Sequence, residues 1–306
     1  MRFQSSIAVA AVAPLLIGAA EPVRLVPVSR WVLNYAEESC RLSRTFGTAA
    51  DPTVLLFESV SPGSMSMLAI GQPLKATMGA KVTARFLPGG RDEEGESARS
   101  VDDKKPAVLW SNVSMMSAAL AAQLKAKWEA EKRLAKKGQR PPPINLGERG
   151  AVKLQQQAFA TAVAGLEIEA RRNRPVILET ASLGRAMAML EQCTKDQLRY
   201  WGVDPAIEEK IARRVWAPAL HHWFKAGDYP RGSINAGEQS VVSFRLLVDA
   251  AGRPSKCTTL SHVDAPAFQK VVCDTLMKRA RFEPAELADG TKVPSYYTSN
   301  VRWRIG

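Results

Sequence analysis

The chain has 306 residues, of which 46% are hydrophobic, and its formal net charge is +12 at pH 7. This length is enough for two ordinary domains, and the apolar content is typical of a globular protein and excludes wholesale disorder. The positive charge favours an acidic partner such as nucleic acid or an anionic surface, although charge alone identifies none.

The first twenty residues have the pattern of a secretory signal peptide. Arg2 supplies a positive start, residues 7–18 form an apolar run, and Gly18, Ala19 and Ala20 are small residues of the kind that precede a cleavage site. The apolar run is shorter than the about 20 residues that a membrane-spanning helix needs. We therefore expect cleavage after residue 20 and export to the periplasm, with an uncleaved anchor as the alternative. Nucleic acid is not an expected partner in that compartment, and contact with the membrane stays open.

The four cysteines are an even number in a chain that is sent to an oxidising compartment, which predicts disulfides. Proximity along the sequence favours Cys257 with Cys273 and Cys40 with Cys193. A zinc site is the alternative, but the C-x-x-C spacing is absent and the three histidines do not flank the cysteines suitably. We therefore expect two disulfides and no metal site.

Residues 21–205 are expected to form a strand-rich N-terminal domain. Short apolar or alternating runs follow one another from Trp31 to Trp110, and glycine and proline clusters separate them. In the segment CRLSRTF, residues 40–46, alternate positions share one face, as in a half-buried strand. The polar stretch 91–105 is interpreted as a charged loop.

A few helices interrupt this pattern. Residues 117–137 are rich in Ala, Lys, Glu and Leu and predict an exposed helix, which the prolines at 141–143 end. Such a basic helix could lie on a membrane surface, but packing along one face of the protein is the commoner arrangement. A hairpin is expected over residues 165–181, and a further helix begins after Ser182 and stops at Gly202.

Residues 206–226 are expected to connect the two domains, and residues 227–306 carry the most regular pattern of the chain. The segment 240–249 alternates cleanly, a turn and a second strand follow, and a helical period of apolar residues begins near residue 266. A final strand ends the chain. This part should form a small antiparallel sheet with a helix on one face, and the fold class expected for the whole chain is α+β.

The order of these C-terminal pieces resembles the TonB C-terminal domain family. The matching pieces are Tyr229-Pro230, the strand SVVSFRLLVD, the turn DAAGR, the helix near Phe268, the segment RARFEPA, Gly290 and the last strand. The resemblance covers residues 227–305. It implies a periplasmic domain that grips outer-membrane receptors by adding a short receptor segment to its sheet edge. The pair Cys257 and Cys273 looks like a variant in which the second strand is stapled to the helix.

The last strand is where this resemblance places a partner. One of its faces carries the five candidate partner-binding residues, which are Tyr296, Thr298, Asn300, Arg302 and Arg304. An edge strand has unpaired backbone groups, so a partner segment could pair there, and the two arginines would favour an acidic segment. The alternative is a solvated face whose edge is blocked by a second copy of the chain or by residues 217–230.

Two departures separate the chain from an energy transducer of this family. Residues 7–20 contain no histidine, and the prolines at 141–143 are too few for a long proline-rich spacer. Catalytic motifs are also missing: the segment GSMSM, residues 63–67, lacks the second glycine of a nucleophile elbow, and no phosphate-binding loop follows a strand.

The sequence therefore predicts a periplasmic protein-binding module that is not an enzyme and uses no cofactor. Its expected partner is an envelope protein, with an outer-membrane receptor segment as the case that the resemblance implies. The alternatives are an anchored energy transducer, an enzyme with an unrecognised site in the N-terminal domain, and a purely structural envelope protein. Nothing in the sequence indicates an oligomeric state.

Overall fold

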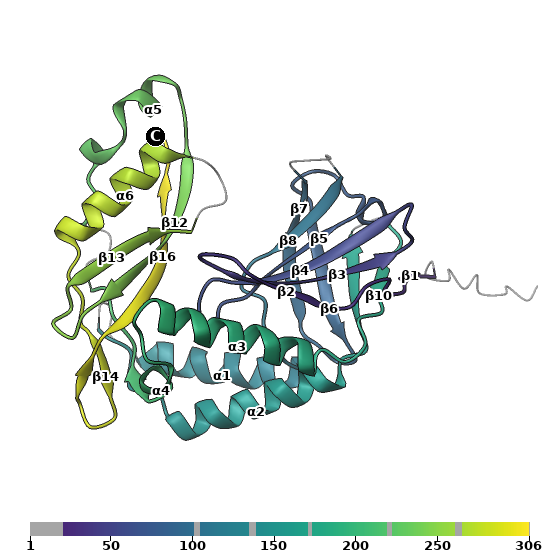
Figure 1. The fold of residues 1–306 in the computed structure, drawn as a ribbon, viewed down its shortest axis with the longest axis horizontal. Helices are drawn as coiled ribbons and strands as arrows, with labels where there is room; N and C mark the ends of the chain where they lie inside the picture. Colours follow the sequence, from purple (N-terminus) through teal and green to yellow (C-terminus); the bar gives the residue numbers. More distant parts are fainter. Residues whose placement is uncertain are drawn as a thin grey trace, which may run out of the picture.

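The computed structural model describes residues 21–100, 105–134, 139–170, 173–218, 222–260 and 265–305. The expected signal peptide lies outside the described residues. The chain has a mixed α+β fold, as predicted, with a large sheet and three long helices in its N-terminal part and two smaller sheets with one long helix in its C-terminal part (Figure 1). Among the helices that the structure describes, none combines the length and apolar character that a membrane span requires.

Ten strands form the N-terminal sheet, which is strongly curved (Figure 1). They are β1 (Val23–Leu25), β2 (Val32–Tyr35), β3 (Cys40–Gly47), β4 (Pro52–Ser59), β5 (Ser66–Ile70), β6 (Lys81–Leu87), β7 (Asp92–Arg99), β8 (Pro106–Trp110), β9 (Gly165–Ala170) and β10 (Val176–Leu178). Their order across the sheet is β1-β10-β9-β6-β7-β8-β5-β4-β3-β2. Only the short β1 runs parallel to its neighbour. The strand-rich prediction for this part of the chain is confirmed.

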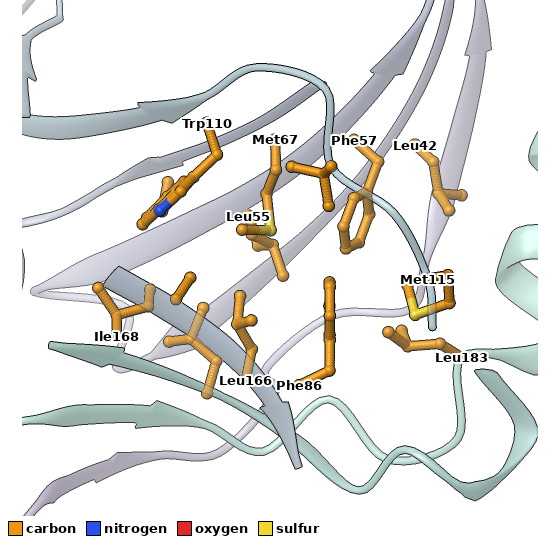
Figure 2. Packing of buried hydrophobic residues seen from close by; sticks show 14 of the residues in the cluster. Leu42, Leu55, Phe57, Met67, Phe86, Trp110, Met115, Leu166, Ile168 and Leu183 are labelled. Atoms are coloured by element: carbon orange, nitrogen blue, oxygen red, sulfur yellow. The ribbon is translucent and has the colours of Figure 1, made fainter. Parts of the chain in front are cut away.

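The curved sheet encloses an apolar core. Alternate residues of β3, β4 and β6 point inward, and Leu42, Phe57 and Phe86 are almost completely buried. Phe57 and Phe86 stack with their ring centroids 6.3 Å apart (Figure 2). Met115 and Leu183 lie beside one another at one end of this cluster (Figure 2). Apolar residues at every second position of these strands point to the same side of the sheet and therefore form the core.

The loop expected over residues 91–105 is wrong, because Asp92–Arg99 form β7 between β6 and β8. The inward positions of β7 include Glu93 and Gly95, which are not the apolar residues of a typical core strand. The packing of Trp110 from β8 explains this exception. A Cβ atom on Gly95 would lie 2.5 Å from Cδ1 of Trp110, so the indole occupies the space that a side chain at residue 95 would fill.

Three long helices lie along one side of the curved sheet (Figure 1). The helices α1 (Ala118–Leu134) and α3 (Gly184–Tyr200) are the two that the sequence predicts. The helix α2 (Leu146–Ala162) was not anticipated. Its only fully buried residue is Ala160, so it lacks the apolar stripe that identifies a packed helix. The side chain of Asn145 accepts a hydrogen bond from the Glu148 N–H and caps its N-terminus.

The C-terminal part contains two small sheets. Its elements are α4 (Pro205–Glu208), β11 (Ile211–Arg213), α5 (Arg231–Asn235), β12 (Ser240–Val248), β13 (Pro254–Thr259), α6 (Pro266–Arg279), β14 (Ala285–Leu287), β15 (Lys292–Val293) and β16 (Ser295–Trp303). One sheet has the order β13-β12-β16, and the other has the order β11-β14-β15. The helix α6 packs on one face of the first sheet, as expected.

Both expected disulfides are present. The Cys40–Cys193 bond ties β3 to α3 in the N-terminal part, and the Cys257–Cys273 bond ties β13 to α6 in the C-terminal part. All four thiols are therefore oxidised, and none of them can serve as a zinc ligand.

The connector between the two parts packs on the C-terminal side. Ile211, Val215 and Trp223 are buried in the C-terminal core, and β11 pairs with β14. The Trp223 ring meets Phe282 at 5.0 Å between centroids. The C-terminal core therefore draws on residues that precede residue 227.

Candidate partner-binding edge of the C-terminal sheet

The last strand, β16, is an edge strand. It pairs with β12 along its full nine residues, from Ser295 opposite Val248 to Trp303 opposite Ser240. On its other side no strand of the described chain is paired with it. An edge of this kind presents backbone N–H and C=O groups that another extended chain can use.

The hydrogen-bonding pattern shows which residues of β16 have outward-facing backbone groups. The Ser243 carbonyl accepts a hydrogen bond from the Leu260 N–H at 2.8 Å, so the backbone of Ser243 faces β13. Because the direction alternates along a strand, the backbone of its neighbour Phe244 faces β16, where it is paired with Ser299. The next residue of β16, Asn300, must then point its N–H and C=O away from the sheet. The same holds for Thr298 and Arg302.

The side chains of β16 divide between two faces. Tyr297 and Trp303 point toward α6 and the core, where the Trp303 ring lies 5.8 Å from that of Phe268. Thr298, Asn300 and Arg302 lie on the opposite face and are exposed. Arg304 is also exposed but follows the last residue of the strand. The structure thus brings together three of the five candidate residues on one accessible face, with a fourth just beyond it.

Tyr296, the fifth candidate, is occupied by a contact with the N-terminal part. Its ring meets Trp201 edge-on at 5.9 Å between centroids, and its hydroxyl donates a hydrogen bond to the Pro62 carbonyl at 3.4 Å. Burial, with the neighbouring Glu208 carboxylate as a smaller cause, raises the pKa of the Tyr296 hydroxyl to about 12. In this arrangement the side chain of Tyr296 is not free to meet a partner.

A carboxylate covers the beginning of the same strand. Glu208, which is 4% exposed, accepts a hydrogen bond from the Ser295 hydroxyl at 2.9 Å and forms an ion pair with Arg214 at 2.5 Å. A buried carboxylate needs such partners to remain charged. The edge of β16 is therefore covered at residues 295–296 and accessible at residues 298–302.

Arg245 fixes the N-terminal part against this sheet. It lies on the outer face of β12, is 2% exposed, and forms an ion pair with Glu38. Its guanidinium lies 3.5 Å from the ring centroid of Trp201, and it donates a hydrogen bond to the Val60 carbonyl. Burial lowers the pKa of Arg245, and the Glu38 carboxylate opposes that change. The sequence gives no sign of this contact, because a charged side chain between apolar ones in an alternating strand is typical of a solvated position.

Residues 217–230, which could have blocked the edge, pack mainly on the inner face. Phe224 and Tyr229 meet Trp303 edge-on at 5.8 and 5.4 Å between ring centroids. Among the described residues of this segment, none forms a backbone hydrogen bond with β16. The segment closes the core beside α6 and leaves the outward backbone of residues 298–302 accessible.

The described residues contain no group of three or more His, Cys, Asp and Glu side chains that could hold a metal ion. Of the three histidines, only His222 lies within the described residues. The chemistry of this edge is that of backbone hydrogen bonding, with arginines on its accessible face.

Residues 225–305 match the sequence profile of a family described as Gram-negative bacterial TonB protein C-terminal. This match confirms the resemblance drawn from the sequence and begins two residues before it. No curated protein and no solved structure matches the chain. Domains of the matched family are periplasmic and not enzymatic, belong to transport across the envelope and interact with outer-membrane proteins. The C-terminal part of the chain is thus a TonB-like domain with an envelope-associated role.

Proposed function

We propose that the protein is a periplasmic protein-binding module that engages an envelope partner by β-strand addition at β16. The observation that carries this proposal is the accessible edge, where Thr298, Asn300 and Arg302 point their backbone groups away from β12. An extended partner segment would form its main-chain hydrogen bonds with these three residues. An outer-membrane receptor segment is the partner that the family favours.

The charge beside the edge favours an acidic partner segment. Arg302 and Arg304 are both exposed and form no ion pair among the described residues. Charges of this kind increase the association rate and the selectivity of a complex, and salt weakens their effect. Binding should therefore weaken as the ionic strength rises.

The proposed location follows from residues 1–20 together with the family of the C-terminal domain. We infer that the signal peptide is cleaved after Ala20 and that the mature protein is released into the periplasm. Retention of Met1 in a membrane fraction that resists carbonate extraction would favour the anchored energy transducer instead. An intact mass measured on protein from the envelope distinguishes the two.

A pair of proline variants tests the binding edge. Thr298→Pro removes an N–H that faces outward and leaves the β12 ladder intact, because the backbone of Thr298 does not face β12. The matched control is Thr259→Pro, which removes an outward N–H from β13, the opposite edge strand. Both variants should retain the circular dichroism and the unfolding transition of the wild type.

The measurement is capture of solubilised envelope proteins on immobilised residues 21–306, with identification by mass spectrometry. A true partner is retained by the wild type and by Thr259→Pro but lost with Thr298→Pro. Arg302→Glu should weaken its retention, most strongly at low salt. If every retained protein binds Thr298→Pro as well as the wild type, β16 is not the docking edge.

A further inference from the structure

A groove of about 550 Å³ lies between α2 and α3, beside the segments that follow β4 and β8. This volume is within the range of small-molecule sites, which is about 300–1,000 Å³. The two helices run in opposite directions along the groove. Lys153 of α2 forms an ion pair with Glu191 of α3 at 2.5 Å, and Thr161 of α2 lies beside Gly184 at the start of α3. The C-terminal end of α2 and the N-terminal end of α3 therefore meet at one end of the groove, and the opposite termini of the two helices meet at the other end.

One end of the groove is apolar and rich in methionine. Its lining includes Met65, Val113, Met115, Met187 and Leu190. The segments that carry Met65 and Met115 are held together by a hydrogen bond from the Val113 N–H to the Met65 carbonyl at 2.8 Å. Methionine side chains are flexible and polarisable, so they adapt to the shape of an apolar ligand. The GSMSM segment, residues 63–67, supplies part of this wall.

The other end of the groove is charged and lies at the connector. Lys195 is paired with Glu209 at 2.9 Å, and Arg214 is paired with Glu208 at 2.5 Å. Arg149 differs from these cations. Within the described part of the chain its guanidinium donates only to the carbonyls of Glu209 and Ile211, and no carboxylate forms an ion pair with it.

The surroundings of Arg149 leave part of its positive charge uncompensated. Burial lowers the pKa of Arg149, and the nearby positive charge of Arg214 lowers it further. Glu208 and Glu209 act in the opposite direction, but each of them is bonded to another cation. An anionic group at this end of the groove would relieve the repulsion between the two arginines.

We propose that this groove binds an amphiphile with one acyl chain and an anionic head group. The head group binds at Arg149, and the acyl chain lies along Met65, Met115 and Leu190. This occupant matches the change from apolar to charged lining along one axis, with Arg149 as the cation that no carboxylate of the described residues pairs. A peptide strand does not match, because the two walls are helices whose backbone groups are already paired. The inference is independent of the function proposed for β16.

The probe for this site is parinaric acid, a fluorescent fatty acid with one acyl chain. Residues 21–306 should bind it saturably, and palmitate should displace it. Lysophosphatidylglycerol tests a phosphate head in place of a carboxylate, and the tighter competitor identifies the source of the ligand. Hexadecanol, which has the same chain length as palmitate and no charge, should compete more weakly than palmitate.

Two variants test the two ends of the groove separately. Arg149→Gln should weaken binding of palmitate by about tenfold or more, as expected for loss of a charged hydrogen bond, and should leave hexadecanol unaffected. The matched control is Arg133→Gln, at an exposed position of α1 outside the groove. Ala188→Trp places an indole in the groove from an exposed lining position and should weaken binding of all these ligands. Its control is Ala126→Trp, at an exposed position of α1.

Three outcomes would overturn the proposal. They are parinarate binding that does not saturate, binding that Ala188→Trp leaves unchanged, and an Arg149→Gln effect that is as large for hexadecanol as for palmitate. Circular dichroism of each variant separates loss of the site from loss of the fold.

Discussion

The two main sheets of this protein end in different ways. The ten-stranded sheet ends in β1, which has three residues, and β2, which has four. The sheet β13-β12-β16 ends in β16, which has nine. Short edge strands limit unwanted pairing with other chains, whereas a long and regular edge strand invites it. The short edges of the N-terminal sheet therefore offer few backbone groups for pairing, whereas the long edge of the C-terminal sheet offers a strand that another chain can extend.

The N-terminal part also determines how much of the long edge is available. Trp201 of the N-terminal part packs on Tyr296, Glu208 of α4 accepts a hydrogen bond from Ser295, and residues 298–302 stay accessible. A partner segment would thus meet an edge whose start is fixed by another part of the same chain. This arrangement restricts the register in which the segment can pair.

The largest expected effect comes from the disulfides, whose loops differ in length between the two parts. Removing Cys40–Cys193, which are 153 residues apart, should destabilise the protein by about 5 kcal/mol. Removing Cys257–Cys273, which are 16 residues apart, should cost about 3 kcal/mol. Both figures are for double serine variants, and urea unfolding measures them. Equal losses would show that loop length does not decide the difference.

A smaller effect is expected in the middle of the large sheet. Gly95→Ala places a Cβ atom 2.5 Å from Trp110 and should destabilise the protein by about 1–3 kcal/mol through overpacking. The matched control is Gly150→Ala on α2, where a Cβ atom has no atom within 4 Å. That change should stabilise by about 1 kcal/mol, because glycine is a poor helix former. Thermal unfolding of the two variants should therefore shift in opposite directions.

The smallest expected effect concerns the titration of Tyr296 at the contact between the two parts, because this titration does not change the stability near neutral pH. The pKa of Tyr296 rises from 10.0 to about 12 on folding. Below about pH 10 the phenol is protonated in both states, so folding stability does not depend on it. Between pH 10 and 12 the unfolded chain releases the proton and the folded chain retains it, so stability falls as the pH rises.

Trp201→Ala should expose the Tyr296 hydroxyl and return its pKa toward 10. The measurement is the absorbance titration of the phenols, with Tyr296→Phe as the control that isolates this residue among the five tyrosines. If Trp201→Ala leaves the titration unchanged, the indole does not shield the edge strand.

The sequence by itself determined the local features of this protein. Alternation over residues 240–249 predicted β12, the even number of cysteines and their spacing predicted both disulfides, and the order of the C-terminal pieces identified the family. The outer face of β16 followed in the same way, because Thr298, Asn300 and Arg302 are polar residues at a period of two. These features depend on neighbouring residues or on covalent chemistry, so they can be predicted without knowing which surfaces meet.

Only the tertiary structure decided the features that depend on contact between distant segments. The polar segment of β7 is a strand because Trp110 fills the space over Gly95, and α2 lies beside α3 without an apolar stripe of its own. Tyr296 and Arg245 have the sequence pattern of solvated positions, but Arg245 is buried and Tyr296 is partly buried because Trp201 lies against them. Periodicity shows which side chains share a face, whereas burial depends on which other surface covers that face.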